Sequence, residues 1–232
     1  MRVSQRAYFP SGKKNNERKK ETARFKVACL NTRTIQDSEG RPQRRSALVA
    51  RELARLDIDI AARSEVRFAG QGSFTEDGAG YTHSLPGKNK DMRRLSCVGF
   101  MIKTSIARKL QILPVGHSDH LMSLRLPIRD SKFATVLSVY APTLQAVTGV
   151  KEVFYRDLHN LLQQADSKDK RFILGDFNTR VGRDFETWKG VHGRHGTGNC
   201  SDDGRLLLEV CFEHQLTVTN TLFQQKSSFK ET

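Results

Sequence analysis

Arg171-Phe172-Ile173-Leu174-Gly175-Asp176-Phe177-Asn178 is the segment from which the rest of this chain is best interpreted. Its apolar first half is typical of a strand, and the strand closes with an acid and an amide two residues apart. Side chains two residues apart on a strand point to the same side, so we expect Asp176 and Asn178 to address one phosphorus atom or one attacking water. The pattern favours phosphodiester chemistry.

The charge of the chain indicates a polyanionic partner. Its 232 residues carry a formal net charge of +14, and Lys and Arg neutralise phosphates and release their counterions. We therefore expect nucleic acid as the partner, DNA before RNA. Residues 1–24 hold eight Lys or Arg against two Glu, which predicts a basic, disordered tail. Residues 25–232 show no linker and are expected to form one domain.

The cysteines and the N-terminus bear on the compartment. The four cysteines form no CxxC pair, which indicates reduced thiols in a reducing environment. The N-terminus lacks an apolar signal region, and no stretch approaches the length that spans a bilayer. We expect an intracellular protein, in the nucleus rather than the cytoplasm, that is not secreted and has no membrane partner.

Hydrophobic periodicity predicts more strands than helices, with the helices spaced to cover paired sheets. Helices are predicted over 43–56, around 154–162 and over 204–213, the last with Ser201 or Asp202 near its N-cap. Strands are predicted from Val27 toward Asn31 and over 58–66, 98–102, 110–115, 121–126, 133–139, 171–174 and 216–219.

Four predicted strand ends present polar groups, namely Asn31, Glu65, Tyr140 and the Asp176/Asn178 pair. Oxygen ligands such as a carboxylate and an amide carbonyl suit a hard cation, and Mg²⁺ is the natural choice, with Mn²⁺ as a substitute. Asp176 could orient or deprotonate the attacking water, and Asn178 could hold that water or a phosphate oxygen. The Tyr140 hydroxyl could donate to the developing charge.

Together and in this order, four blocks resemble the endonuclease/exonuclease/phosphatase superfamily. The blocks are Leu30-Asn31-Thr32-Arg33, Ser64-Glu65-Val66-Arg67, Val139-Tyr140-Ala141-Pro142 and Gly175-Asp176-Phe177-Asn178. Over residues 41–56 and 204–223 the chain is similar to the apurinic-like endonuclease domains of RTE/Bov-B retrotransposons and to the craniofacial development protein 2 family. The resemblance implies a four-layer α/β/β/α sandwich of the exonuclease III/DNase I type. It also implies Mg²⁺-dependent DNA endonuclease activity, with Asn31 and Glu65 binding the metal.

Two departures from the superfamily pattern predict weak or absent activity. Its late Asp-His pair and the strands before it are missing by Thr232, so the fold is expected to be C-terminally incomplete. Ser118-Asp119-His120 spells the missing motif at a different place in the order, and we do not expect it to substitute. Arg63 lies two residues before Glu65, which predicts either a buried unpaired charge or an ion pair with Glu65. These changes indicate a decayed copy of retrotransposon origin.

Several alternatives stay open. Arg33, Arg67, Arg180 and Arg183 are candidate contacts to DNA phosphates or plain surface charge. The histidines and cysteines between 192 and 211 could form a zinc site, although a loop is favoured. A lipid or inositol phosphate phosphodiesterase is the competing enzyme, and a catalytically dead nucleic-acid-binding remnant is the competing class.

Overall fold

The computed structural model describes residues 25–32, 42–68, 72–76, 79–86, 96–129 and 132–226. The predicted tail over 1–24 and Arg33 lie outside these residues. The chain divides into two compact units, Met1–Tyr140 with Ser167–Asp176 and Ala141–Asp166 with Phe177–Thr232. A single domain over 25–232 therefore stays a prediction, and each unit is described by itself.

A five-stranded sheet in the first unit has the strand order β1-β2-β5-β4-β3. Its strands are β1 (Val27–Asn31), β2 (Ile60–Phe68), β3 (Gly72–Glu76), β4 (Tyr81–Leu85) and β5 (Ser96–Lys103). β1 runs parallel to β2, and the other neighbours are antiparallel. Because β1 and β2 are parallel and Asn31 pairs with Ser64, the C-terminal end of β1 lies beside Glu65.

A four-stranded sheet in the same unit has the order β6-β7-β8-β9. Its strands are β6 (Val115–Gly116), β7 (Leu121–Arg129), β8 (Lys132–Tyr140) and β9 (Lys170–Asp176). β8 and β9 are parallel, with Tyr140 opposite Asp176. Parallel strands present their carboxyl ends at one edge of a sheet, so these two side-chain positions share that edge.

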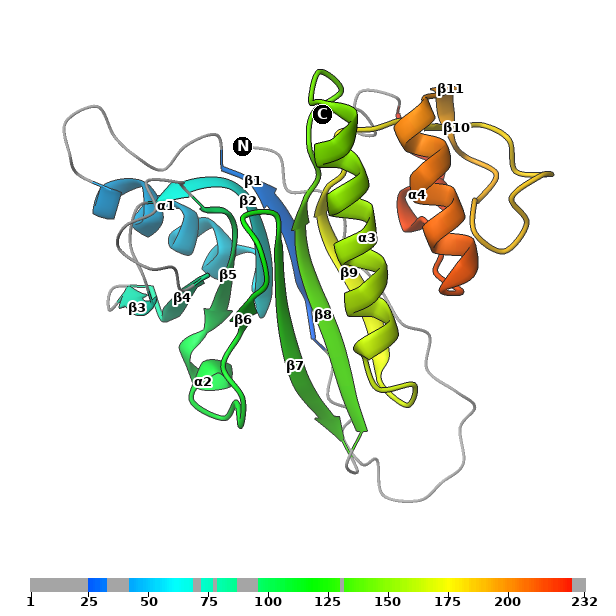
Figure 1. Cartoon of the computed structure of the whole chain (residues 1–232). Helices are drawn as coiled ribbons and strands as arrows, with labels where there is room; N and C mark the ends of the chain where they lie inside the picture. The colour runs from blue at the N-terminus through cyan, green and yellow to red at the C-terminus, as the bar shows by residue number, and fades with distance from the viewer. Residues whose placement is uncertain are drawn as a thin grey trace. The chain divides into compact units, whose positions relative to one another are not determined.

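The two sheets of the first unit pack face to face around an apolar core. Side chains from β2 and β5 meet side chains from β7 and β8 in one buried cluster that includes Ile60, Phe100, Met122 and Val136. A second cluster on the other face of the five-stranded sheet contains Leu53 of helix α1 (Pro42–Arg55). The unit therefore has a helix layer and two sheet layers (Figure 1). A one-turn helix, α2 (Thr104–Ala107), follows β5.

The second unit is built on helices α3 (Thr148–Gln164) and α4 (Asp202–Glu213), which Figure 1 draws in green and orange. A short hairpin, β10 (Val181–Gly182) with β11 (Thr197–Cys200), precedes α4, and a 3₁₀ helix covers Thr219–Thr221. The Ser201 hydroxyl accepts a hydrogen bond from the Gly204 amide at 3.2 Å, so the predicted N-cap is confirmed.

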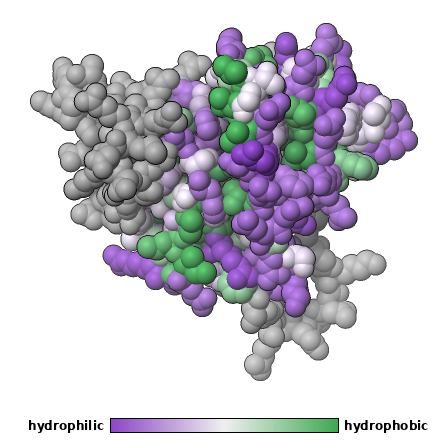
Figure 2. Space-filling model, viewed as in Figure 1, coloured by the Kyte–Doolittle hydropathy of each residue, from purple (hydrophilic) through white to green (hydrophobic). Residues whose placement is uncertain are grey.

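The surface drawn in Figure 2 is mainly hydrophilic, and its apolar side chains form small patches. Among the described residues, no helix combines the length and apolarity needed to cross a membrane. Exposed apolar residues do occur, such as Val147 and Phe212, but single exposed apolar side chains are ordinary on proteins.

Most predicted elements are confirmed, and the mixed α/β class is correct. The strand predicted over 110–115 is wrong except at Val115, because Ile112 and Leu113 are exposed and Pro114 lacks an amide hydrogen for sheet pairing. The strand predicted over 216–219 is also wrong, since the chain turns there into the 3₁₀ helix. Strands β3 and β4 were not predicted, because their polar composition gives little apolar alternation.

Candidate active site

Four of the five predicted site residues meet in the first unit, at the ends of strands. The side-chain amide Nδ2 of Asn31 donates to Oε1 of Glu65 at 2.8 Å and lies 3.5 Å from Oδ2 of Asp176. The Tyr140 hydroxyl donates to the same Glu65 oxygen at 3.2 Å. The amide, the two carboxylates and the phenol therefore form one hydrogen-bonded cluster, called the carboxylate cluster below.

Glu65 reaches this cluster through an unusual backbone conformation. Its φ of 55° lies in the left-handed region, which a non-glycine residue adopts at some cost in strain. The register between β2 and β5 also shifts after Ser64. Regular side-chain alternation would place Glu65 on the same face as Arg63, whereas the irregular backbone lets its carboxylate reach Asn31 and Tyr140.

Arg63 itself is directed away from the cluster. It is 1% exposed, and its Nη1 lies 2.9 Å from Nδ1 of His83. Its Nε and Nη2 have no hydrogen-bond partner among the residues that the structure describes, and burial lowers the pKa of the guanidinium to about 9. Among the described contacts no ion pair joins Arg63 to Glu65, so that prediction is wrong. The prediction of a buried, poorly paired charge is confirmed.

Gly175 allows β9 to deliver Asp176 to the cluster. Its φ is +153°, and a Cβ built there would lie 1.9 Å from the backbone oxygen of Val139 on β8. Any side chain at this position would force the two strands apart. On the neighbouring β1, burial raises the pKa of the Cys29 thiol to about 11, with the Gly175 backbone and the Asp176 charge beside it.

His120 contacts Tyr140 twice. Its Nδ1 lies 2.6 Å from the backbone oxygen of Tyr140, and the two rings stack at a centroid distance of 6.3 Å with 17° between their planes. A carbonyl oxygen can only accept, so Nδ1 donates, and a neutral ring then carries its lone pair on Nε2. The Ser118-Asp119-His120 motif therefore ends against a residue of the cluster, which its place in the sequence gave no reason to expect.

Asn178, the fifth predicted residue, belongs to the second unit. β9 ends at Asp176, so the strand alternation from which a shared direction was predicted does not extend to Asn178. Asn178 adopts a left-handed φ of 47°, which asparagine tolerates, and its Nδ2 donates to the Ala141 backbone oxygen at 2.7 Å. This bond gives Asn178 a structural role within its own unit, and its catalytic role stays a prediction.

The predicted DNA-contacting arginines are placed in part. Arg180 and Arg183 are exposed on the second unit, one on each side of the two-residue strand β10. Arg67 lies in β2, where only its backbone is described, and Arg33 lies outside the described residues. Contacts of these side chains to phosphate stay predictions.

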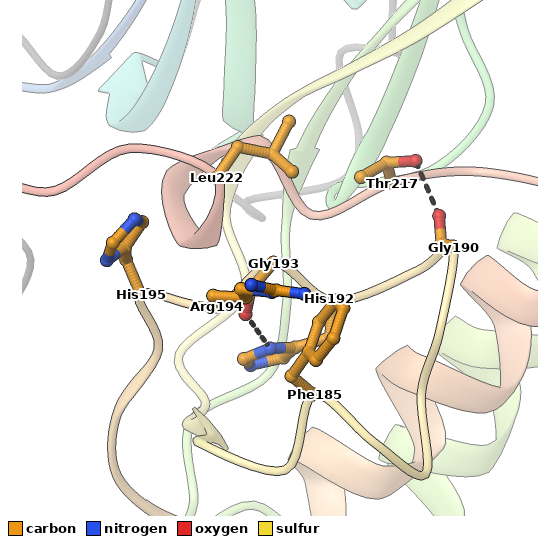
Figure 3. Close-up of a pocket in the computed structure, with 8 residues that line it drawn as sticks. All are labelled: Phe185, Gly190, His192, Gly193, Arg194, His195, Thr217 and Leu222. Atoms are coloured by element: carbon orange, nitrogen blue, oxygen red, sulfur yellow. Dashed lines mark hydrogen bonds between the residues drawn. The ribbon is translucent and has the colours of Figure 1, made fainter.

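A cavity of about 300 Å³ in the second unit is lined by none of the predicted catalytic or Mg²⁺-binding residues, but by His192 and His195 of the alternative zinc site (Figure 3). His192 lines it with both ring nitrogens against carbonyl oxygens, Nδ1 at 2.6 Å from Gly193 and Nε2 at 3.1 Å from Gly182. Thr217 closes another side through a 2.8 Å hydrogen bond to the Gly190 oxygen. Because its ring nitrogens are engaged in this way, His192 is a poor ligand for the alternative zinc site.

The carboxylate cluster fits a hard divalent cation by its chemistry. Two carboxylates and one amide converge within hydrogen-bonding distance, and oxygen donors of this kind are those that Mg²⁺ takes. In the present arrangement the Asn31 amide turns its nitrogen toward both carboxylates. Its oxygen would be a ligand after rotation of the amide, whose orientation follows from its hydrogen-bond partners.

The fold that carries this cluster has counterparts among solved AP endonucleases. The structure matches an AP endonuclease, LMAP, from Leishmania major at a TM-score of 0.52 and 15% identity, over 82% of this chain and 66% of that chain. It also matches an AP endonuclease from Archaeoglobus fulgidus, at a TM-score of 0.51 and 16% identity, over 82% of this chain and 70% of that chain. The predicted exonuclease III/DNase I type of fold is therefore confirmed.

The sequence is similar to craniofacial development protein 2. The identity to the Bos taurus protein is 33% over 183 residues, which cover 78% of this chain and 29% of the relative. The Tragulus javanicus protein is 32% identical and is covered over 30% of its length. This chain thus spans about three tenths of the length of these curated relatives. No protein-family model matches the sequence. The chain is therefore a relative of craniofacial development protein 2 over this stretch and has the fold of the AP endonucleases.

Proposed function

We propose that this protein is a Mg²⁺-dependent phosphodiester hydrolase that nicks DNA. The observation that carries the proposal is the carboxylate cluster, in which residues 31, 65, 140 and 176 converge from two sheets. Polar and titratable side chains that are far apart in the sequence but hydrogen-bonded to one another in the fold are typical of a reaction centre.

Each side chain has a role that its position supports. Asn31 and Glu65 hold the metal, Mg²⁺ or Mn²⁺, which supplies charge stabilisation at the phosphoryl oxygens. Asp176 orients the attacking water and takes its proton. The Tyr140 hydroxyl, whose single hydrogen bonds to Glu65 here, would redirect that hydrogen to the charge that develops on the phosphate. The role predicted for Asn178 from sequence is not built on this cluster, because that residue belongs to the second unit.

DNA is the proposed substrate for two reasons. The net charge of +14 favours a polyanion, and the two solved structures with the same fold are named as AP endonucleases. The alternative of a lipid or inositol phosphate substrate finds no comparable support. We further propose a retrotransposon origin, on the sequence blocks at 41–56 and 204–223, and a nuclear location, on the basic character of the chain.

Relaxation of supercoiled plasmid tests the proposal. The wild type is expected to convert supercoiled to open-circular DNA slowly with Mg²⁺, in keeping with the weak activity predicted from sequence, and EDTA should stop the conversion. Glu65→Gln and Asp176→Asn should each lower the rate about a hundredfold or more, because each removes a charge that acts in the transition state. Glu209→Gln and Asp166→Asn are matched controls on exposed positions and should nick at the wild-type rate.

The same assay separates the proposal from its rivals. Nicking that is equal in the wild type and in both active-site variants would show that the centre is misassigned. Salt-dependent binding of DNA without any nicking would support the nucleic-acid-binding alternative instead.

A further inference from the structure

A second group of ligand-type side chains lies in the second unit, apart from every residue of the proposed reaction. His159 on α3, Glu213 at the end of α4 and His214 at the C-cap of α4 each offer one donor atom, and these atoms lie within 4.8 Å of one another. Nδ1 of His159 is 3.1 Å from Nε2 of His214 and 3.2 Å from Oε2 of Glu213. Among the described residues this is the group of three His, Cys, Asp or Glu side chains whose ligand atoms lie close enough to share an ion.

Hydrogen bonding alone accounts poorly for this group. Nδ1 of His159 faces both a ring nitrogen and a carboxylate oxygen. If it carries a hydrogen, that hydrogen can point well at only one of them. If it carries a lone pair, it repels the Glu213 oxygen, which accepts but does not donate when ionised. A cation at the centre resolves the conflict, because it attracts all three lone pairs at once.

We propose that His159, Glu213 and His214 bind a zinc ion. Two imidazole nitrogens and one carboxylate oxygen are a common ligand set for Zn²⁺, whereas Mg²⁺ prefers oxygen alone. Zinc bonds of about 2.0–2.1 Å in a tetrahedron place neighbouring donors about 3.3 Å apart. The two observed separations, 3.1 and 3.2 Å, are close to that spacing.

The three side chains differ in exposure, and these differences are compatible with a zinc site that is open to solvent on one side. His214 is buried, His159 is 27% exposed, and the Glu213 side chain is 57% exposed. The buried histidine fixes one ligand direction, and the exposed side leaves room for water as a fourth ligand. An exposed fourth position distinguishes this site from fully enclosed four-residue zinc centres.

A zinc ion here would complete the attachment of α4 to α3. The start of α4 is already held, because Asp203 accepts from Lys151 at 2.8 Å and its backbone oxygen accepts from Tyr155 at 3.0 Å. The end of α4 carries Glu213 and His214, which meet His159 of α3. The ion would therefore fasten the second end, and zinc would stabilise the unit by binding the folded form.

Calorimetric titration of the full chain with ZnCl₂, after removal of metal by a chelator, tests the proposal. We expect one zinc ion per chain, a rise in melting temperature, and a visible Co²⁺ spectrum of the tetrahedral type. His159→Gln and His214→Gln should each weaken zinc binding roughly tenfold or more, since even outer-shell changes weaken metal sites by this factor. His117→Gln, an exposed histidine of the first unit, should bind zinc as the wild type does.

Further variants settle the outcome. His195→Gln tests the zinc site suggested by sequence, and loss of binding in that variant alone would overturn the proposal. Absence of stoichiometric zinc binding in the wild type would also overturn it. If His214→Gln fails to fold, as judged by its circular dichroism, His159→Gln carries the test, because its side chain is partly exposed. Binding that persists in excess Mg²⁺ separates this site from the carboxylate cluster, so the two proposals can fail independently.

Discussion

The Tyr140 hydroxyl lies 3.2 Å from Oε1 of Glu65 and donates a hydrogen bond to it. Tyr140 ends a strand of one sheet and Glu65 lies in a strand of the other, so this bond joins the two layers at the centre. The same oxygen accepts from the Asn31 amide at 2.8 Å. One carboxylate oxygen therefore accepts from two donors, one from each sheet.

Removal of the Tyr140 hydroxyl should slow the reaction without unfolding the protein. Tyr140→Phe keeps the ring against His120 and deletes only the donor, so we expect kcat for plasmid nicking to fall about ten- to a hundredfold. Tyr81→Phe is the matched control, because its buried hydroxyl donates to the Ile58 backbone oxygen. That variant should lose stability and keep its kcat. Equal kcat values for Tyr140→Phe and the wild type would remove Tyr140 from the mechanism.

A side chain at Gly175 should disrupt the junction of β8 and β9. Gly175→Ala would place a Cβ 1.9 Å from the Val139 oxygen at a φ that favours glycine. We expect the free energy of unfolding to fall by about 2 to 4 kcal/mol in urea denaturation. Gly149→Ala in α3 has open space around its Cβ and should leave stability unchanged or raise it by about 0.5 to 1 kcal/mol. Similar stability for the two variants would argue against the close approach.

Replacement of Arg63 should stabilise the protein. Its guanidinium is buried with two unbonded nitrogens, and desolvated charges of this kind oppose folding. Arg63→Leu is expected to raise the free energy of unfolding by about 1 to 3 kcal/mol in urea. Arg156→Leu on the exposed side of α3 should change it by less than about 0.5 kcal/mol. Destabilisation by Arg63→Leu would show that the contact with His83 stabilises the protein by more than the desolvation of the buried charge costs.

His83 should make stability depend on pH in the acid range. Burial, aided by the nearby charge of Arg63, lowers the pKa of His83 from 6.5 to about 3. The unfolded chain therefore takes up this proton first, so the contribution is complete above pH 6.5 and is lost as pH falls toward 3. The urea midpoint of the wild type should decrease between pH 6.5 and pH 4, and His83→Gln should show a shallower decrease. Parallel pH profiles for the two proteins would contradict this assignment.

The residues of the carboxylate cluster were predicted from the sequence more successfully than the backbone and side chains around them. Asn31, Tyr140 and Asp176 were identified because polar residues after apolar runs mark strand ends, and the parallel pairs β1–β2 and β8–β9 then bring those ends together. The left-handed backbone conformation at Glu65 could not be predicted from the sequence, because a glutamate within a strand pattern is expected to have regular strand geometry. This irregular backbone separates Glu65 from Arg63, between which the sequence had suggested an ion pair.

Contacts between residues far apart in the chain could not be predicted from the sequence either. The stacking of His120 on Tyr140 depends on the antiparallel register of β7 with β8, which no local pattern specifies. The meeting of His159 with Glu213 and His214 depends on how α3 and α4 pack. An isolated histidine on a helix face is more often a core or surface residue than a ligand, so sequence alone gave no reason to join them.

Binding of Mn²⁺, followed by electron paramagnetic resonance, tests the central claim most directly, because Mn²⁺ takes the same oxygen ligands as Mg²⁺. We predict a Mn²⁺ site in the wild type that Mg²⁺ displaces, and that is lost in Glu65→Gln and in Asp176→Asn. The site should persist in Glu209→Gln and in His159→Gln, which alter an exposed carboxylate and the proposed zinc ligand. Unchanged Mn²⁺ affinity in both Glu65→Gln and Asp176→Asn would contradict the claim that these side chains form one metal centre.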